Sequence, residues 1–117
     1  MEVRAVARNI RVSPEKVRLL ADMVRGKKVE DALTLLKFAT TPTAIAVAKA
    51  IKSAAANAES GFQMTAADLK VAQIYVDRGM MMKRYRAAAR GRAAPLLRRT
   101  SHITVVVSEQ ERHGTQS

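Results

Sequence analysis

Residues 69–107, LKVAQIYVDRGMMMKRYRAAARGRAAPLLRRTSHITVVV, contain the pattern that decides the fold. The two ends of this stretch, 69–76 and 102–107, are rich in β-branched residues and predict two strands. The 25 residues between them are too many for a structureless loop inside a compact domain. We therefore expect an extended element that leaves the domain and returns to it.

The segment between the two strands is the most basic part of the chain. It has no acidic residue from Arg78 to Ser108, and Gly91 and Pro95 lie near its middle. Flanking strands of similar length predict one long hairpin, with legs of about 12 residues that at roughly 3.3 Å per residue reach about 40 Å. Its eight cations are Arg78, Lys83, Arg84, Arg86, Arg90, Arg92, Arg98 and Arg99.

A run of basic residues is often only a solvated loop or a disordered tail. This run is instead internal, rich in arginine and bracketed by two predicted strands. Arginine makes paired hydrogen bonds to phosphate oxygens and stacks on exposed bases, which lysine does poorly. We therefore favour structured RNA as the partner of this arm.

The residues upstream of the arm predict a strand and three helices. Residues 2–12 alternate loosely and predict a short basic strand. Ser13 and Pro14 form a helix-start signal in which the serine hydroxyl is expected to cap the first turn, and Gly26 is expected to end that helix.

Two more helices follow after short connections. An amphipathic pattern predicts the second helix from Val29 to about Ala39. The third is alanine-rich, begins after a second cap-plus-proline signal at Thr41, covers 43–58 and is expected to end at Gly61.

These elements predict one α+β domain over 1–117. Its body, 1–77 and 102–110, is expected to be three helices packed on a short antiparallel sheet. One long β-hairpin arm, 78–101, protrudes from it, and the tail 111–117 is expected to be flexible. Because aromatic residues make up only 3% of the chain, the core must be built from Ala, Val, Ile, Leu and Met.

Composition narrows the function further. The chain has 21 Lys and Arg against 10 acidic residues, a net charge of +11, which favours a polyanionic partner. The absence of cysteine excludes disulfides, thiolate catalysis and cysteine-bound zinc. No window approaches the roughly 18 apolar residues of a membrane span, so we expect a soluble, cytoplasmic protein without a membrane partner.

A second basic cluster lies in the N-terminal quarter of the chain. It predicts a phosphate-binding surface on the body, although a solvated helix face is the alternative. Its members are Arg4, Arg8, Arg11, Arg18, Arg25, Lys27 and Lys28. We interpret Lys49, Lys52 and Lys70 as isolated and solvated.

Catalytic and metal sites are not expected. Ser101 and His102 are adjacent, so on a strand their side chains point to opposite faces and cannot act as a nucleophile and its base. Two distant histidines, His102 and His113, without any cysteine do not make a credible metal site. We predict no cofactor, no metal and no small-molecule substrate.

Several longer motifs resemble those of the bacterial large-subunit ribosomal protein L twenty-two family. They match in order and with compatible spacing over nearly the whole chain, which is more specific than one short pattern. One departure is Met80, where the family often has proline. The motifs are SPEKVRLLADMVRGKKVEDAL (13–33), SAAANAE (53–59), VDRG (76–79), MKR (82–84) and RGRAAPLLRRTSHITVVVSE (90–109).

This resemblance implies a non-catalytic protein that binds 23S rRNA and helps the subunit to assemble. The body would lie on the ribosome surface beside neighbouring large-subunit ribosomal proteins, and the hairpin would line the peptide exit tunnel, with the nascent peptide near its tip. The implied tip residues are Arg84, Ala88, Ala89, Arg90, Gly91 and Arg92.

Two other classes of protein remain as alternatives. A DNA architectural protein can grip the minor groove with a basic β-arm, but the arm here offers alanine and arginine rather than an apolar wedge. A helix-turn-helix reader over 14–25 and 29–39 is less favoured, because Glu30 and Asp31 would face the phosphates.

Overall fold

The structure is a computed structural model that describes residues 2–39, 41–87 and 93–109, with side chains described outside positions 66 and 82–98. Its elements follow the chain in the order β1 (Glu2–Ile10), α1 (Pro14–Val24), α2 (Val29–Ala39), α3 (Pro42–Phe62), the short 3₁₀ helix η1 (Ala66–Asp68), β2 (Leu69–Arg78), β3 (Met82–Ala87), β4 (Ala93–Arg98) and β5 (Ser101–Glu109). The predicted tip over 88–92 and the predicted tail over 111–117 lie outside the described residues.

The body contains a three-stranded antiparallel sheet in the order β1-β5-β2. β5 is the central strand. Val107 pairs with Val3 on one side and with Val71 on the other. The strands predicted at 69–76 and 102–107 are therefore confirmed, and both extend a little further than predicted.

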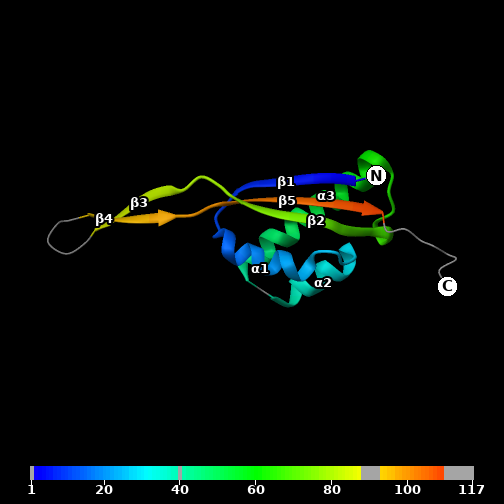
Figure 1. The fold of residues 1–117 in the computed structure, drawn as a ribbon, viewed down its shortest axis with the longest axis horizontal. Coiled ribbons are helices and arrows are strands. Elements are labelled where there is room, and N and C mark those ends of the chain that lie inside the picture. The colour runs from blue at the N-terminus through cyan, green and yellow to red at the C-terminus, as the bar shows by residue number, and fades with distance from the viewer. Residues whose placement is uncertain (1, 40, 88–92, 110–117) are drawn as a thin grey trace.

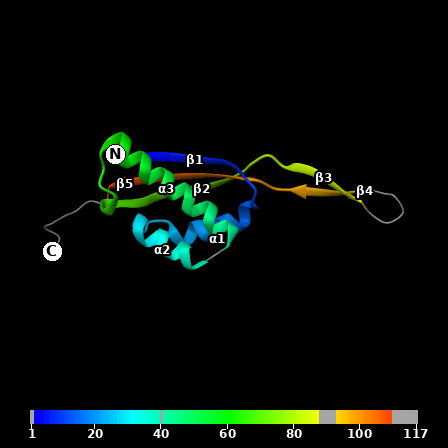
Figure 2. The ribbon, with the colours of Figure 1, turned by 180° about the vertical axis from the view of Figure 1, so that it is seen from behind.

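All three helices pack on one face of this sheet. α3 crosses in front of the strands in Figure 2, whereas the strands lie in front in Figure 1. The stripe that α3 buries recurs every three or four residues and is mostly alanine, so the helix can approach the sheet closely. It consists of Ala44, Val47, Ile51, Ala54 and Ala58, all at most 1% exposed.

The core agrees with the prediction made from composition. Its fully buried hydrophobic side chains, among the described residues, are Ile, Leu, Val and Ala. Phe38, Phe62 and Tyr75 are 79%, 50% and 47% exposed. The predicted α+β fold, with three helices packed on an antiparallel sheet, is confirmed.

The helix ends follow the sequence signals only in part. The Thr41 hydroxyl accepts a hydrogen bond from the Ala44 amide (3.1 Å) and caps α3 as predicted. Ser13 occupies the N-cap of α1, but its side chain makes no capping hydrogen bond, so that prediction was wrong. α3 also continues through Gly61 and is capped by Gln63 in the left-handed conformation, with φ 54°.

The turn between α1 and α2 pairs with β2. Gly26 donates to the Val71 carbonyl and Val71 donates to the Lys27 carbonyl, both at 2.8 Å. Gly26 has a φ of 82°, which a residue with a side chain rarely adopts. This glycine ends the first helix as predicted and also joins the turn to the sheet.

The arm continues the body sheet as a separate two-stranded sheet (Figure 1). β3 pairs antiparallel with β4, from Met82 opposite Arg98 to Ala87 opposite Ala93. At the junction the Gly79 amide donates a hydrogen bond to the Thr100 carbonyl (2.9 Å). The Thr100 hydroxyl in turn donates to the carbonyl of Met80, the residue after Gly79 (2.5 Å). The two legs are thus fastened together where they leave the body.

Candidate nucleic-acid interface

The sheet face that the helices leave open carries two of the predicted RNA-binding arginines. Arg4 and Arg8 are both exposed on β1. In the register of the sheet, Val6 and Tyr75 flank the same residue of β5 from opposite sides. Tyr75 is 47% exposed, and its hydroxyl donates to Gln73 Oε1 (2.5 Å). Cations beside an exposed aromatic ring offer phosphate contacts and a stacking surface for a base.

Two other predicted residues, Arg18 and Arg25, are engaged within the protein. The Arg25 guanidinium donates to Asp22 Oδ1 (2.6 Å) and to the Ile74 carbonyl (2.9 Å). Arg18 donates to the Val76 carbonyl (3.3 Å). These carbonyls belong to β2, an edge strand whose unpaired groups need partners. Both arginines therefore have an internal role that the sequence prediction missed, and their contact with RNA stays a prediction.

Lys27 and Lys28 lie on the turn between α1 and α2 and are exposed. The backbone of the turn is held against β2, because Lys28 also forms an isolated bridge with Lys70. The two cations therefore sit on a fixed part of the surface. Their predicted role in RNA binding remains untested.

The base of the arm brings together cations that are distant in the sequence. Arg11, Arg78 and Arg99 are all exposed there, and Arg99 forms a long ion pair with Glu15 (3.6 Å). Arg11 and Arg99 line the same hollow as Lys16. Lys16 was not among the predicted residues, and only its position shortly after Arg11 and the helix-start signal could have indicated it.

The remaining predicted cations lie on the arm. The structure describes the backbone of its legs, where Lys83, Arg84 and Arg86 belong to β3 and Arg98 belongs to β4. Of the implied tip, Arg84 pairs in register with Leu96. The other tip residues, Ala88, Ala89, Arg90, Gly91 and Arg92, lie outside the described residues.

The lysines interpreted as isolated are only partly so. Lys49 and Lys52 are exposed on α3, but they line a shallow groove together with Lys37 of α2. Sequence reasoning missed this cluster because its members come from two helices. It adds a third basic area to the body.

The side chains of Ser101 and His102 have different hydrogen-bond partners. The Ser101 hydroxyl is buried and donates to the Val12 carbonyl (2.5 Å). His102 Nδ1 accepts from the Asn9 amide (3.1 Å). Among the described residues, three or more potential metal ligands do not gather anywhere, and no helix there is long and apolar enough to cross a membrane.

Comparison with known proteins gives a consistent result. The model of a family described as ribosomal protein L22p/L17e matches residues 5–108. The chain is 60% identical over 109 residues to the large ribosomal subunit protein uL22 of Dehalococcoides mccartyi strain 195, covering 93% of this chain and 100% of that protein. It is 52% identical to the uL22 of Desulforamulus reducens and 50% identical to that of Herpetosiphon aurantiacus, each over 111 residues, 95% of this chain and 98% of the relative.

Proposed function

Because the chain belongs to the ribosomal protein L22p/L17e family, we propose that it is a structural constituent of the bacterial large ribosomal subunit. Its place of action is then the cytoplasm. The observation that carries this proposal is the 60% identity to a large-subunit protein over 93% of the chain. The alternative of a DNA architectural protein has no support among the relatives described above.

Binding to 23S rRNA is the chemistry that the surface supports. The cations behind the net charge of +11 lie on the arm, on the open sheet face, at the base of the arm and in the groove between α2 and α3. Cations on several sides suit a protein that holds several rRNA segments together, which is how it would help assembly. A charged surface of this kind binds phosphates and loses affinity steeply with salt.

The arm supports a more specific role. Two antiparallel strands leave the body from a fixed junction and carry Lys83, Arg84, Arg86 and Arg98. We propose that the arm passes through rRNA, and that its tip (Arg84, Ala88, Ala89, Arg90, Gly91 and Arg92) lines the exit tunnel near the nascent peptide. The body lies beside neighbouring large-subunit proteins. The role is structural rather than catalytic, without a cofactor or a small-molecule substrate.

Co-sedimentation tests this function directly. Tagged full-length protein is compared in its own cells with a variant that lacks residues 82–98 and with a body variant, Arg4→Gln/Arg8→Gln. We expect the intact protein to remain stoichiometric with the large subunit after a high-salt wash, and both variants to be retained less well. Protein that sediments with DNA or stays free would overturn the proposal.

A further inference from the structure

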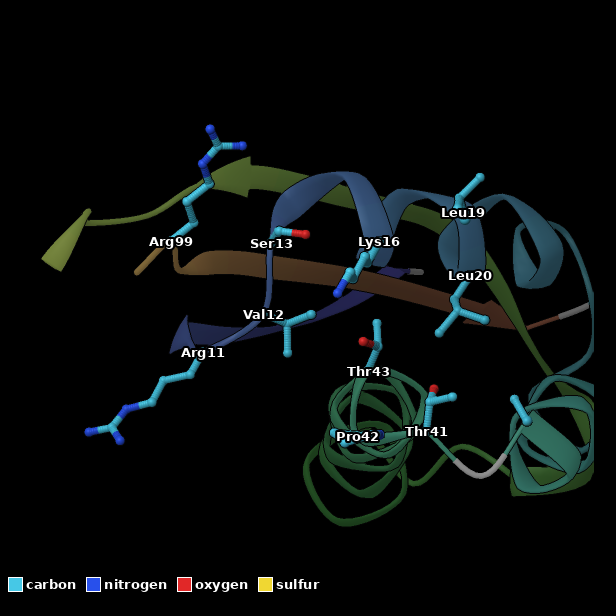
Figure 3. A pocket seen from close by; sticks show the side chains of 11 residues that line it. Arg11, Val12, Ser13, Lys16, Leu19, Leu20, Thr41, Pro42, Thr43 and Arg99 are labelled. Atoms are coloured by element: carbon cyan, nitrogen blue, oxygen red, sulfur yellow. The ribbon is translucent and has the colours of Figure 1, made fainter. Parts of the chain in front are cut away.

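A hollow lies between the start of α1, the start of α3 and the base of the arm (Figure 3). Its volume is about 880 Å³, within the range of roughly 300–1,000 Å³ in which small-molecule sites fall. We propose that this hollow receives one unpaired nucleotide of the rRNA. The proposal rests on the proposed function and adds to it a site that reads a single base.

The charge around the hollow selects an anion. Arg11, Lys16 and Arg99 come from three segments of the chain, and among the described residues no acidic side chain lines the hollow with them. The two arginine side chains point away from the other lining residues, whereas Lys16 lies among them (Figure 3). The ion pair of Arg99 with Glu15 is long, and both side chains are more than half exposed, so it holds Arg99 only weakly.

The floor of the hollow is apolar and fits the face of a base. Val12 and Leu20 are both partly buried against the core, and they converge on Thr43 in Figure 3. The phosphates of a duplex lie on a convex surface, so a duplex cannot place a base against this recessed floor. An unpaired nucleotide can do so while its phosphate stays at the cationic rim, which is the usual way in which RNA sequence is recognised.

Thr43 supplies a group that can recognise the base. It is only 9% exposed, and its side chain points into the hollow (Figure 3). Its hydroxyl can donate a hydrogen bond to a base edge or a ribose in the hollow, or accept one from it. An acidic peptide could satisfy the cations but would leave the apolar floor uncovered.

A tethered probe tests the assignment, because the chain has no cysteine of its own. Protein that carries an iron chelate at Ser13→Cys, one of the residues that line the hollow, is assembled into large subunits, and rRNA cleavage is mapped. The control is Ser53→Cys, on an exposed part of α3 that lines a different hollow. We expect cleavage from position 13 in one short unpaired rRNA segment that the control does not cut. Cleavage of duplex rRNA alone, or none, overturns the assignment.

A second measurement separates base recognition from simple charge. Thr43→Val keeps the shape and removes the hydroxyl, and Thr34→Val is the control, since that hydroxyl is exposed and bonds its own helix. We expect Thr43→Val alone to raise the reactivity of one nucleotide in the position-13 footprint toward base-specific reagents about fivefold, the size of one lost hydrogen bond. Unchanged reactivity throughout the footprint overturns the recognition of a base.

The test also distinguishes this site from the proposed function. If the probe-carrying protein does not enter large subunits, the proposed function fails and the nucleotide site with it. If it enters them but no rRNA is cleaved, only the nucleotide site is overturned. Binding of a ten-residue polyglutamate peptide at Lys16 would then identify the hollow as a protein contact.

Discussion

Replacing Gly79 with alanine probes how the arm is fastened to the body. A Cβ atom at this position collides with Thr100 Oγ1 and lies 3.1 Å from His102 Cε1 and 3.3 Å from the Thr100 carbonyl carbon. Thr100 is only 3% exposed, and its hydroxyl and carbonyl are bonded to Met80 and to Gly79 itself. The crowding can therefore be relieved only by breaking these bonds or by shifting a strand.

The expected cost follows from these contacts. Overpacking costs about 1–3 kcal/mol, and losing the Thr100 hydrogen bond adds about 1 kcal/mol. We expect Gly79→Ala to lower the free energy of unfolding by about 2–4 kcal/mol. Thr100→Ala removes the colliding oxygen at a cost of about 1 kcal/mol. The double variant should then be about 1–2 kcal/mol more stable than the sum of the single changes implies.

Urea unfolding followed by circular dichroism measures these differences, provided that the slope of the transition is unchanged. Gly61→Ala is the matched control. Nothing lies within 4 Å of a Cβ at that position of α3, so the change should stabilise the protein by about 0.5–1 kcal/mol. The reasoning is refuted if Gly79→Ala is as stable as the parent, or if the two junction changes add within about 0.5 kcal/mol.

Three further experiments test other features. Thr41→Ala should cost about 1 kcal/mol in urea unfolding because it removes a cap, whereas Ser13→Ala, which removes none, should be nearly neutral; equal costs would contradict this. Ile51→Ala should cost about 2–5 kcal/mol by opening a cavity under a fully buried side chain, and a loss below 1 kcal/mol would show that the core refills. Arg25→Gln should lower the unfolding free energy by about 1 kcal/mol through its lost bond to a β2 carbonyl, while Arg4→Gln should leave stability unchanged and reduce the salt dependence of rRNA binding by about one ion. If Arg4→Gln instead lowered stability and Arg25→Gln reduced the salt dependence of rRNA binding, the roles assigned to the two arginines would be wrong.

The sequence predicted those parts of the fold that depend on local pattern. Alternation and β-branched residues located the strands around the arm, and the Thr41-Pro42 signal located the start of α3. The end of α3 was missed because the glycine at position 61 is followed by Phe62 and a left-handed Gln63, and packing on the sheet outweighs the weak helix preference of one glycine. Ser13 fits the cap pattern, but its hydroxyl makes no capping bond.

The candidate interface was less predictable, because charge alone does not show what an arginine contacts. Arg25 resembles its neighbours in the sequence, yet it satisfies a carbonyl 49 residues away. Tyr75 looked like an ordinary strand residue, and its exposure became clear only once the helices were placed on the other face. Lys16 lies near Arg11 and Arg99 at the base of the arm because β1, α1 and β5 meet there. Clusters of residues from distant segments depend on topology and have no local pattern in the sequence.

The central position of β5 has a consequence for synthesis of the chain. β1 and β2 pair with β5 and not with each other, and the pairing of Glu2 with Ser108 spans almost the full length. β1 therefore has no partner strand while the helices and the whole arm are being synthesised. The body can complete its sheet only after β5 has left the ribosome, so a nascent chain stopped before residue 101 should leave β1 and β2 without their partner strand and accessible to chaperones along those unpaired edges.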